Sequence, residues 1–235
     1  MSEQTKLRES SRLIFALIAL CVSLFAHTVI ARADEIAVWN FNDSDLIVDH
    51  GSGTLTTDVN LTNIVFNLGG TTINARQGDA AGQSATLQGG TANGNNGRSL
   101  TISFSTVGFA NISISFATQA TSTGFNSNQL QYSLDGVNFV AFGIPYSPPT
   151  TFTLVAFDLS SITGLNNNPN AALRIVFNGA TTATGNNRID NLVVEGQNAT
   201  VPEPASLLLL GMGLTGTAAV IRRSRRKKGW IDIRD

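Results

Sequence analysis

The feature that most constrains the fold is a strict alternation of apolar and polar residues through the middle of the chain. It is clearest over residues 99–105 and 112–116, where every second residue is apolar. Side chains that repeat with a period of two lie on one face of a β-strand, so each such segment is predicted to be a half-buried strand. The alternating apolar positions are Ile36, Val38, Leu100, Ile102, Phe104, Ile112, Ile114, Phe116, Leu130, Tyr132, Leu134, Phe152, Leu154, Ala156, Leu173, Ile175, Phe177, Leu192 and Val194.

Turn-forming residues separate these strands. Asp135-Gly136 lies between residues 129–134 and 137–140 and suits a two-residue hairpin turn with positive φ at both central positions. Stretches rich in Gly, Asn, Thr and Ser are predicted to be long loops at the ends of the sheets, and they cover residues 88–98, 121–128, 166–170 and 181–187.

About ten strand candidates without helical segments predict an all-β fold over residues 34–198: an antiparallel β-sandwich, most simply a jelly roll, with its first and last strands adjacent. Two segments, Tyr132 to Phe139 (YSLDGVNF) and Arg188 to Gly196 (RIDNLVVEG), resemble elements of galactose-binding-like jelly rolls. The resemblance implies a fold and not a ligand.

Residues 1–33 have the three parts of a secretory signal peptide. A basic start with Lys6, Arg8 and Arg12 precedes an apolar run over residues 13–30. Ala31 and Ala33 then fit the small-residue positions that signal peptidase requires, so Asp34 is the expected new N-terminus. The alternative is an uncleaved anchor helix, because the apolar run is slightly long for a signal peptide.

The C-terminal end has the features of a membrane anchor. Residues 205–221 would form an apolar transmembrane helix about 26 Å long, close to the thickness of the hydrocarbon core. A basic cluster over residues 222–228 follows, formed by Arg222, Arg223, Arg225, Arg226, Lys227 and Lys228. Cytoplasmic ends of spans carry such clusters, so residues 34–198 are expected in the periplasm and residues 229–235 as a short cytoplasmic tail.

Pro202-Glu203-Pro204 directly precedes this helix. A short polar motif, an apolar helix and an Arg-rich end, in this order over residues 199–228, resemble the PEP-CTERM sorting signal. The resemblance implies that an exosortase in the inner membrane cuts near the motif, after which the domain reaches the cell surface or the extracellular space.

Charge and reactive residues restrict the function of the central domain. Residues 34–198 hold eleven acidic residues, four arginines and no lysine, a formal charge of −7. Such a surface disfavours nucleic acid, but it excludes neither cations nor neutral glycans. His50 is the only histidine there and Cys21 lies in the apolar N-terminal run, so no catalytic residue is predicted.

Calcium is the one metal that these residue types favour, since it needs only oxygen ligands. Asp43 and Asp45 follow the first strand and Asp190 begins the last, so adjacent terminal strands would bring them together. The alternatives are a charged turn for the first two, and for Asp190 an ion pair with Arg188 or Arg174 or a backbone cap.

Three functions remain. The first is a non-catalytic structural or adhesive protein of the cell surface or extracellular matrix, within exopolysaccharide or biofilm. The second is a lectin-like carbohydrate-binding module, with or without calcium, for which Trp39, Tyr132 and Phe125 could stack on a sugar, Phe125 being the candidate expected to be exposed. The third is a polysaccharide-degrading enzyme, for which the sequence shows acids but no defined pair.

Overall fold

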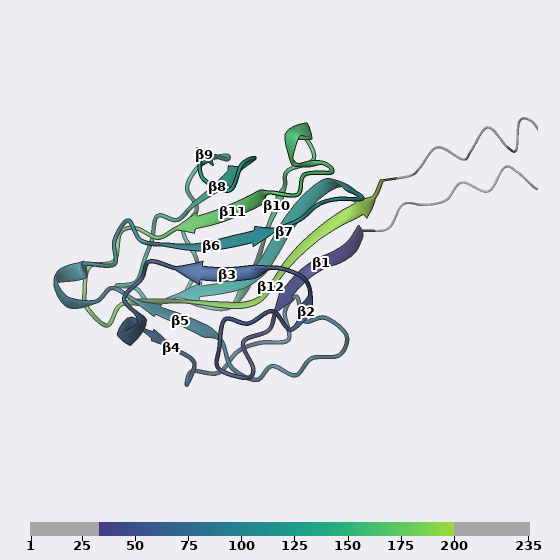
Figure 1. The fold of residues 1–235 in the computed structure, drawn as a ribbon. Coiled ribbons are helices and arrows are strands. Elements are labelled where there is room, and N and C mark those ends of the chain that lie inside the picture. The colour runs from purple at the N-terminus through teal and green to yellow at the C-terminus, as the bar shows by residue number, and fades with distance from the viewer. Residues whose placement is uncertain (1–32, 200–235) are drawn as a thin grey trace, which may run out of the picture. The chain divides into compact units, whose positions relative to one another are not determined.

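The computed structural model describes residues 33–199 as two β-sheets packed face to face, whose paired strands run antiparallel (Figure 1). This confirms the predicted all-β sandwich. The strands are β1 (Ala33–Trp39), β2 (His50–Gly51), β3 (Thr54–Thr57), β4 (Ile64–Val65), β5 (Ala85–Gln88), β6 (Ser99–Phe104), β7 (Phe109–Ala120), β8 (Gln129–Ser133), β9 (Val140–Ala141), β10 (Thr153–Asp158), β11 (Ala171–Val176) and β12 (Asn186–Asn198). The helical segments of this range are single 3₁₀ turns: η1 (Leu61–Asn63), η2 (Thr91–Asn93) and η3 (Thr163–Leu165).

The strand order follows the connectivity of a jelly roll. The seven-stranded sheet has the order β10-β7-β12-β1-β2, with β5 pairing with β12 and β4 with β5. The five-stranded sheet has the order β3-β6-β11-β8-β9. From β5 to β8 each successive strand changes sheet, and so do the last three strands. The first and last strands are neighbours, as predicted.

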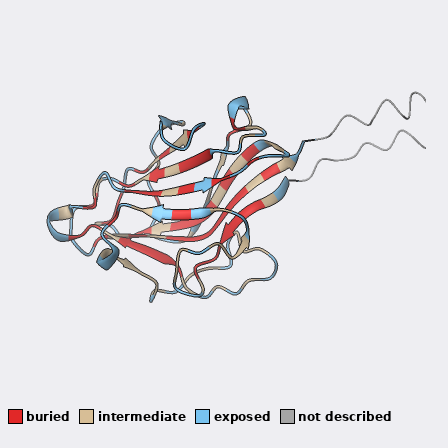
Figure 2. Ribbon diagram, viewed as in Figure 1, coloured by how far each residue is buried: buried red, intermediate tan, exposed pale blue. Residues whose placement is uncertain are grey.

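The core lies between the sheets and is built by the predicted alternation (Figure 2). Ile102, Leu173 and Ile114 are fully buried at its centre. Burial of one such side chain contributes roughly 1.5–3 kcal/mol. Apolar residues therefore define the inner faces, and the residues between them face outward.

The predicted alternation is wrong in two places. Leu134 is 43% exposed because it follows the end of β8, and on β10 Leu154 is 50% exposed and Ala156 is exposed as well. Edge strand β10 has apolar residues in both phases, and its largest side chain, Phe157, packs 5.7 Å from Tyr146 and 6.5 Å from Phe116. Phe157 and Val155 therefore face the core, in place of the predicted Leu154 and Ala156.

The predicted hairpin at Asp135-Gly136 is present, but its turn is different. Strands β8 and β9 pair across a six-residue connection, residues 134–139. Gly136 has φ +76°, a conformation that favours glycine, whereas Asp135 has no positive φ. The two-residue turn with positive φ at both positions was therefore a wrong prediction.

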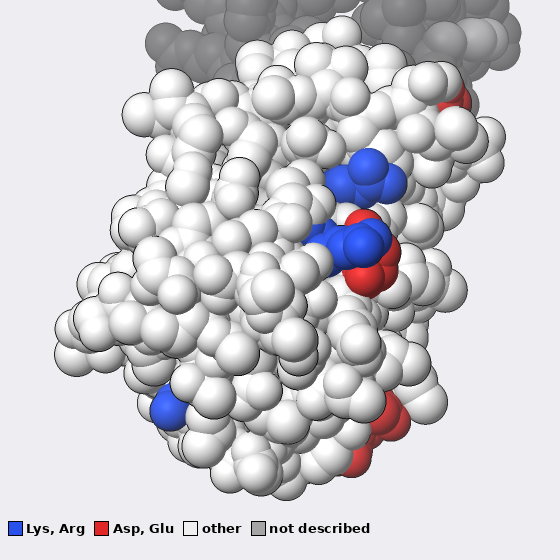
Figure 3. Space-filling view, turned by 90° about the vertical axis from the view of Figure 1, so that its left-hand side faces the viewer, with Lys and Arg blue, Asp and Glu red and all other residues white. Residues whose placement is uncertain are grey.

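Three of the predicted loops pack together at one end of the sandwich. Backbone hydrogen bonds join Gly90 N to Ala183 O (2.9 Å) and Thr181 N to Thr123 O (3.0 Å). Figure 3 faces this end, where charged side chains are sparse. The end is a hydrogen-bonded surface and not a set of separate loops.

The outer face of the seven-stranded sheet is covered by the segment between β4 and β5, residues 66–84. Asn74 Nδ2 donates to Ser115 Oγ of β7 (3.1 Å) and to Asn191 O of β12 (2.8 Å). Arg76 forms ion pairs with Glu195 of β12 (2.9 Å) and Glu35 of β1 (3.5 Å). These contacts fix the segment across the three central strands.

No helix in residues 33–199 is long and apolar enough to cross a membrane. The predicted signal helix and the predicted transmembrane helix lie outside the described residues.

Candidate functional site

The outer face of the five-stranded sheet carries rows of mostly small polar side chains, of which Thr54, Thr56 and Ser103 are exposed, whereas Ala172 and Ser133 are buried. The inward positions of β6, β11 and β8 hold Ile102, Leu173 and Leu130, so the alternate positions face out. Strand register places these outward residues in rows: Thr54, Ser103, Ala172 and Ser133 in one, and Thr56, Thr101, Arg174 and Gln131 in the next.

Arg174 lies at the centre of this face. It belongs to β11, the middle strand, and is half-buried. Its Nε donates to Thr101 Oγ1 of β6 (3.2 Å), and its Cζ lies 3.6 Å from the centroid of the Phe139 ring. A guanidinium over an aromatic ring is a cation–π contact, which fixes one face of the guanidinium and leaves its edge free to donate.

The loop that carries Phe139 is held by Asp135. Its Oδ1 accepts hydrogen bonds from Asn138 N (2.8 Å), Val137 N (2.9 Å) and Ser133 Oγ (2.9 Å), and its Oδ2 accepts one from Asn138 Nδ2 (2.6 Å). Backbone and side-chain bonds from Asn138 are the largest cause that holds the pKa of Asp135 well below its usual range. Asp135 is thus an ionised cap that sets the shape of the loop over β11.

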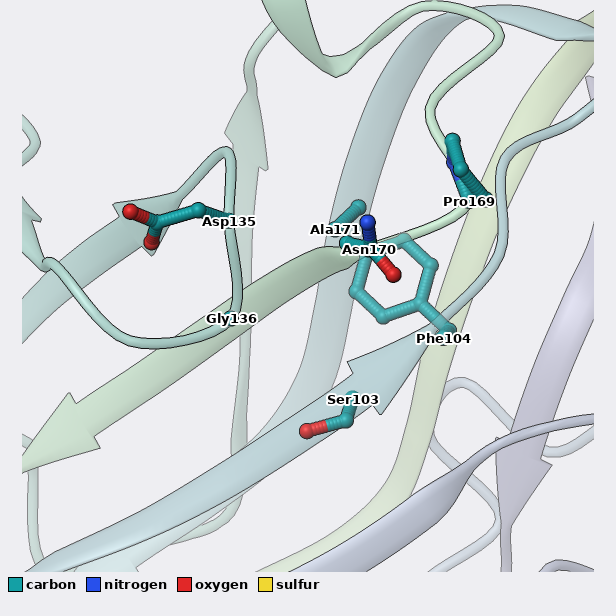
Figure 4. Close-up of a pocket in the computed structure, with 7 residues that line it drawn as sticks. All are labelled: Ser103, Phe104, Asp135, Gly136, Pro169, Asn170 and Ala171. Carbon is teal, nitrogen blue, oxygen red and sulfur yellow. The ribbon is translucent and has the colours of Figure 1, made fainter.

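A pocket of about 320 Å³ adjoins the face where β6 ends and β11 begins (Figure 4). Its polar lining includes Ser103 and Asn170, and its apolar lining includes Phe104 and Pro169. The Asp135 carboxylate points away from Ser103 and Asn170, toward its own loop. Hydroxyl and amide groups are therefore the polar groups that the pocket offers to a ligand.

The aromatic residues selected from the sequence lie elsewhere. Trp39 is fully buried and its Nε1 donates to Leu46 O (3.1 Å). Phe125 was expected to be exposed, but it is fully buried with its ring 5.6 Å from that of Phe177, so that expectation was wrong. Tyr132 is half-buried on an inward position, as predicted. Sequence reasoning did not select Phe139, although its place three residues after the Asp-Gly turn was the available signal.

Asp190 and the two acids near β1 occupy different environments. Asp43 is exposed, and Asp45 Oδ1 accepts from Ile47 N (2.7 Å). Asp190 is fully buried at a bulge of β12 and accepts from Thr71 N (2.6 Å) and Asn191 N (2.9 Å). This is the backbone cap that the sequence left open as an alternative.

Burial raises the pKa of Asp190 to about 7, against the lowering effect of those two amide bonds. Residues 33–199 contain no group of three or more His, Cys, Asp or Glu that could hold a metal ion. Calcium therefore stays a prediction without a defined set of ligands.

The predicted processing residues fall mainly outside the described range. Ala33 is the first described residue and begins β1, while β12 ends at Asn198. Ala31, the Pro202-Glu203-Pro204 motif and the basic cluster from Arg222 to Lys228 lie outside the described residues.

Comparison with protein families identifies the C-terminal segment. Residues 200–226 match the PEP-CTERM protein-sorting motif. The chain carries a PEP-CTERM sorting signal. This signal implies export, sorting at the membrane and processing by an exosortase. The match covers the sorting segment only and leaves the activity of the sandwich open.

Solved structures similar to this chain include three carbohydrate-related domains and an adhesin domain. The CBM22-1 xylan-binding domain of Xyn10C from Paenibacillus barcinonensis is 12% identical, with 73% of this chain and all of that chain covered and a TM-score of 0.46. TmCBM61 in complex with beta-1,4-galactotriose is 11% identical, with 67% of this chain and 94% of that chain covered and a TM-score of 0.42. For domain 4 of AbnA, an extracellular arabinanase from Geobacillus stearothermophilus, in complex with arabinotriose, these values are 15%, 70%, 93% and 0.41. A cleaved adhesin domain of Lys-gingipain from Porphyromonas gingivalis gives 12%, 70%, 99% and 0.44. No curated protein matches the sequence.

Proposed function

We propose that this protein is an exported, non-catalytic carbohydrate-binding sandwich that binds polysaccharide on the outer face of its five-stranded sheet. The observation that carries the proposal is the set of Thr, Ser and Gln side chains around the Phe139–Arg174 pair, with Thr54, Thr56 and Ser103 exposed on β3 and β6. Sugar rings bind through hydroxyl and amide hydrogen bonds combined with apolar contact, and this face and the adjoining pocket provide both. The polysaccharide would belong to the extracellular matrix or biofilm of the host.

The carboxylates around the face support a non-catalytic role. Glycoside hydrolysis requires two carboxyl groups across the bond to be cut. Asp135 is the one carboxylate that lines the pocket, and its oxygens accept hydrogen bonds from its own loop. Binding is therefore the activity that this geometry favours.

Retention of the purified domain, residues 34–198, on polysaccharides immobilised in native gels tests the binding proposal. We expect slower migration with at least one exopolysaccharide of the host, and loss of that retardation in Phe139→Ala. Leu61→Ala, which alters a 72% exposed residue on η1, is the control and should migrate like the unaltered domain. Unretarded migration on every polysaccharide would remove the proposal.

We further propose that Pro202, Glu203 and Pro204 direct cutting by the exosortase after signal peptidase has acted next to Ala31 and Ala33. Replacement of the three motif residues by alanine in the native host should leave a larger, membrane-bound protein, visible on immunoblots of membrane and medium fractions. The same size and location as the unaltered protein would remove this part of the proposal.

A further inference from the structure

The two sheets differ sharply in charge. Arg174 is the only charged residue in the five strands of the five-stranded sheet, β3, β6, β8, β9 and β11. The strands of the seven-stranded sheet carry five acids and one arginine, namely Asp34, Glu35, Asp158, Asp190, Glu195 and Arg188. The formal charge of −7 over residues 34–198 therefore does not describe the candidate binding face, whose strands carry a single positive charge.

Arg174 is also free to bind an anion. Arg76 and Arg98 each lie within 4 Å of a carboxylate, whereas Arg174 has no such partner within residues 33–199. A guanidinium has five N–H donors. Within residues 33–199, the Arg174 side chain uses one of them, the Nε–H that it donates to Thr101. Its terminal nitrogens therefore remain available for a ligand on the outer face of the sheet.

The contacts of Arg174 orient it as a receptor for a carboxylate. Phe139 covers one face of the guanidinium and Thr101 holds its Nε, so the side chain is ordered before a ligand arrives. An ordered guanidinium pairs with a carboxylate through two parallel hydrogen bonds. The nearest acid, the ionised Asp135, accepts hydrogen bonds from its own loop and points away from Ser103 and Asn170. The acids of the other sheet are screened beyond about 8–10 Å at physiological ionic strength, so they oppose such binding only weakly.

We propose that the sugar recognised at this face is acidic, with its carboxylate bound by Arg174 and its ring hydroxyls by the neighbouring Thr, Ser and Gln side chains. This inference rests on the proposed carbohydrate binding and narrows the ligand class from glycans in general to uronate-containing polysaccharides. The formal charge of the domain alone had left cations and neutral glycans open as ligands.

Polyuronates and their carboxyl-reduced derivatives form matched probes, because reduction replaces each carboxylate by a neutral CH₂OH and leaves the linkage unchanged. The probes are polygalacturonate, polymannuronate and a glucuronate-containing polymer, each with its reduced form. Binding to the full-length chain in detergent micelles is measured by biolayer interferometry. At least one polyuronate should bind at least about tenfold more tightly than its reduced form, because even one of the two charge-assisted hydrogen bonds contributes about that factor.

Arg174→Gln should reduce this preference to less than about twofold. Arg98→Gln removes the same charge from a residue that is 52% exposed and paired with Asp58, and it should keep the preference. Circular dichroism of both variants checks that they fold.

The outcomes separate this inference from the proposed function. Equal binding of each polyuronate and its reduced form would overturn the acidic-sugar inference and leave carbohydrate binding intact. Absence of binding to all the polymers and to the host exopolysaccharide would overturn both. The comparison of probes with the unaltered chain remains decisive even if Arg174→Gln fails to fold.

Discussion

The two outer faces of the sandwich are used in different ways. The seven-stranded sheet is covered by residues 66–84, and Arg76 pairs there with Glu35 and Glu195. The five-stranded sheet is open except for the short loop that sets Phe139 on Arg174. On the covered face Arg76 is paired with two carboxylates, while on the other face Arg174 keeps donors for a ligand.

This difference indicates where substitutions should affect stability and where they should affect binding. A covered polar face contributes to folding because each lost partner leaves a buried group unsatisfied. An open polar face contributes little, since water replaces the lost partner. The seven-stranded sheet should therefore respond mainly in stability, and the five-stranded sheet mainly in ligand binding.

The largest effect is expected for Asp190→Ala on the covered side. The substitution removes the acceptor of Thr71 N and Asn191 N, and with it one of the contacts that hold residues 66–84 on β12. We expect a loss of about 3 kcal/mol in the free energy of unfolding, measured in urea. Asp43→Ala, at an exposed site, is the control and should change it by less than about 0.5 kcal/mol. Similar small losses in both variants would contradict the assigned role of Asp190.

The dependence of stability on pH should also differ between Asp190 of the seven-stranded sheet and Asp135 beside the five-stranded sheet. Burial raises the pKa of Asp190 to about 7, so the folded protein keeps a proton that the unfolded chain releases near pH 3.9. The stability that this proton contributes is complete below about pH 4, decreases as the pH rises toward 7, and is lost above it, with a slope of at most about 1.4 kcal/mol per pH unit. Urea denaturation at a series of pH values measures it.

Asp190→Asn should remove this decrease between pH 4 and 7. Asp135 has the opposite sign, because hydrogen bonds to its carboxylate lower its pKa. Its contribution is present above about pH 4 and is lost only as the pH falls further. Identical pH profiles for the unaltered domain and Asp190→Asn would refute the assignment.

Phe139→Ala should have a smaller effect on stability and a clear one on binding. Phe139 is half-buried, and its contact with Arg174 is worth about 0.5–1 kcal/mol. We expect a stability loss near 1 kcal/mol in thermal unfolding together with weaker polysaccharide binding. Phe139→Leu keeps apolar cover but lacks the aromatic ring, so it should recover stability more than affinity. Full affinity in Phe139→Ala would show that the ring does not organise the site.

Most of the sandwich could be predicted because its strands obey a local rule. The burial of Ile102, Ile114 and Leu173 is predicted by alternation alone. The hairpin between β8 and β9 is predicted by the two residues Asp135 and Gly136. The sorting signal at residues 200–226 could also be predicted from the sequence, because its parts follow one another along the chain. Local patterns suffice where sequence neighbours determine the structure.

The candidate site could not be predicted, because it depends on contacts between distant segments. Arg174 and Thr101 are joined only by the register of β11 on β6, and Phe139 reaches them through a loop whose shape depends on the Asp135 side chain. The predicted exposure of Phe125 was wrong because its position in a loop of the sequence does not indicate that its ring packs against that of Phe177. Burial of Asp190 likewise depends on Thr71, which is 119 residues away.

Leu154→Thr should have the smallest effect and tests the part of the alternation that failed. Leu154 is 50% exposed on edge strand β10, so its replacement by a polar β-branched residue should change the free energy of unfolding by less than about 0.5 kcal/mol. Phe157→Ala, on the opposite face of the same strand, removes contacts with Phe116 and Tyr146 and should lower it by about 2 kcal/mol. Urea denaturation of the two variants decides which phase of β10 faces the core. A larger loss at Leu154 would mean that the strand register follows the simple alternation, and would place the edge of the seven-stranded sheet one residue out of its described pairing.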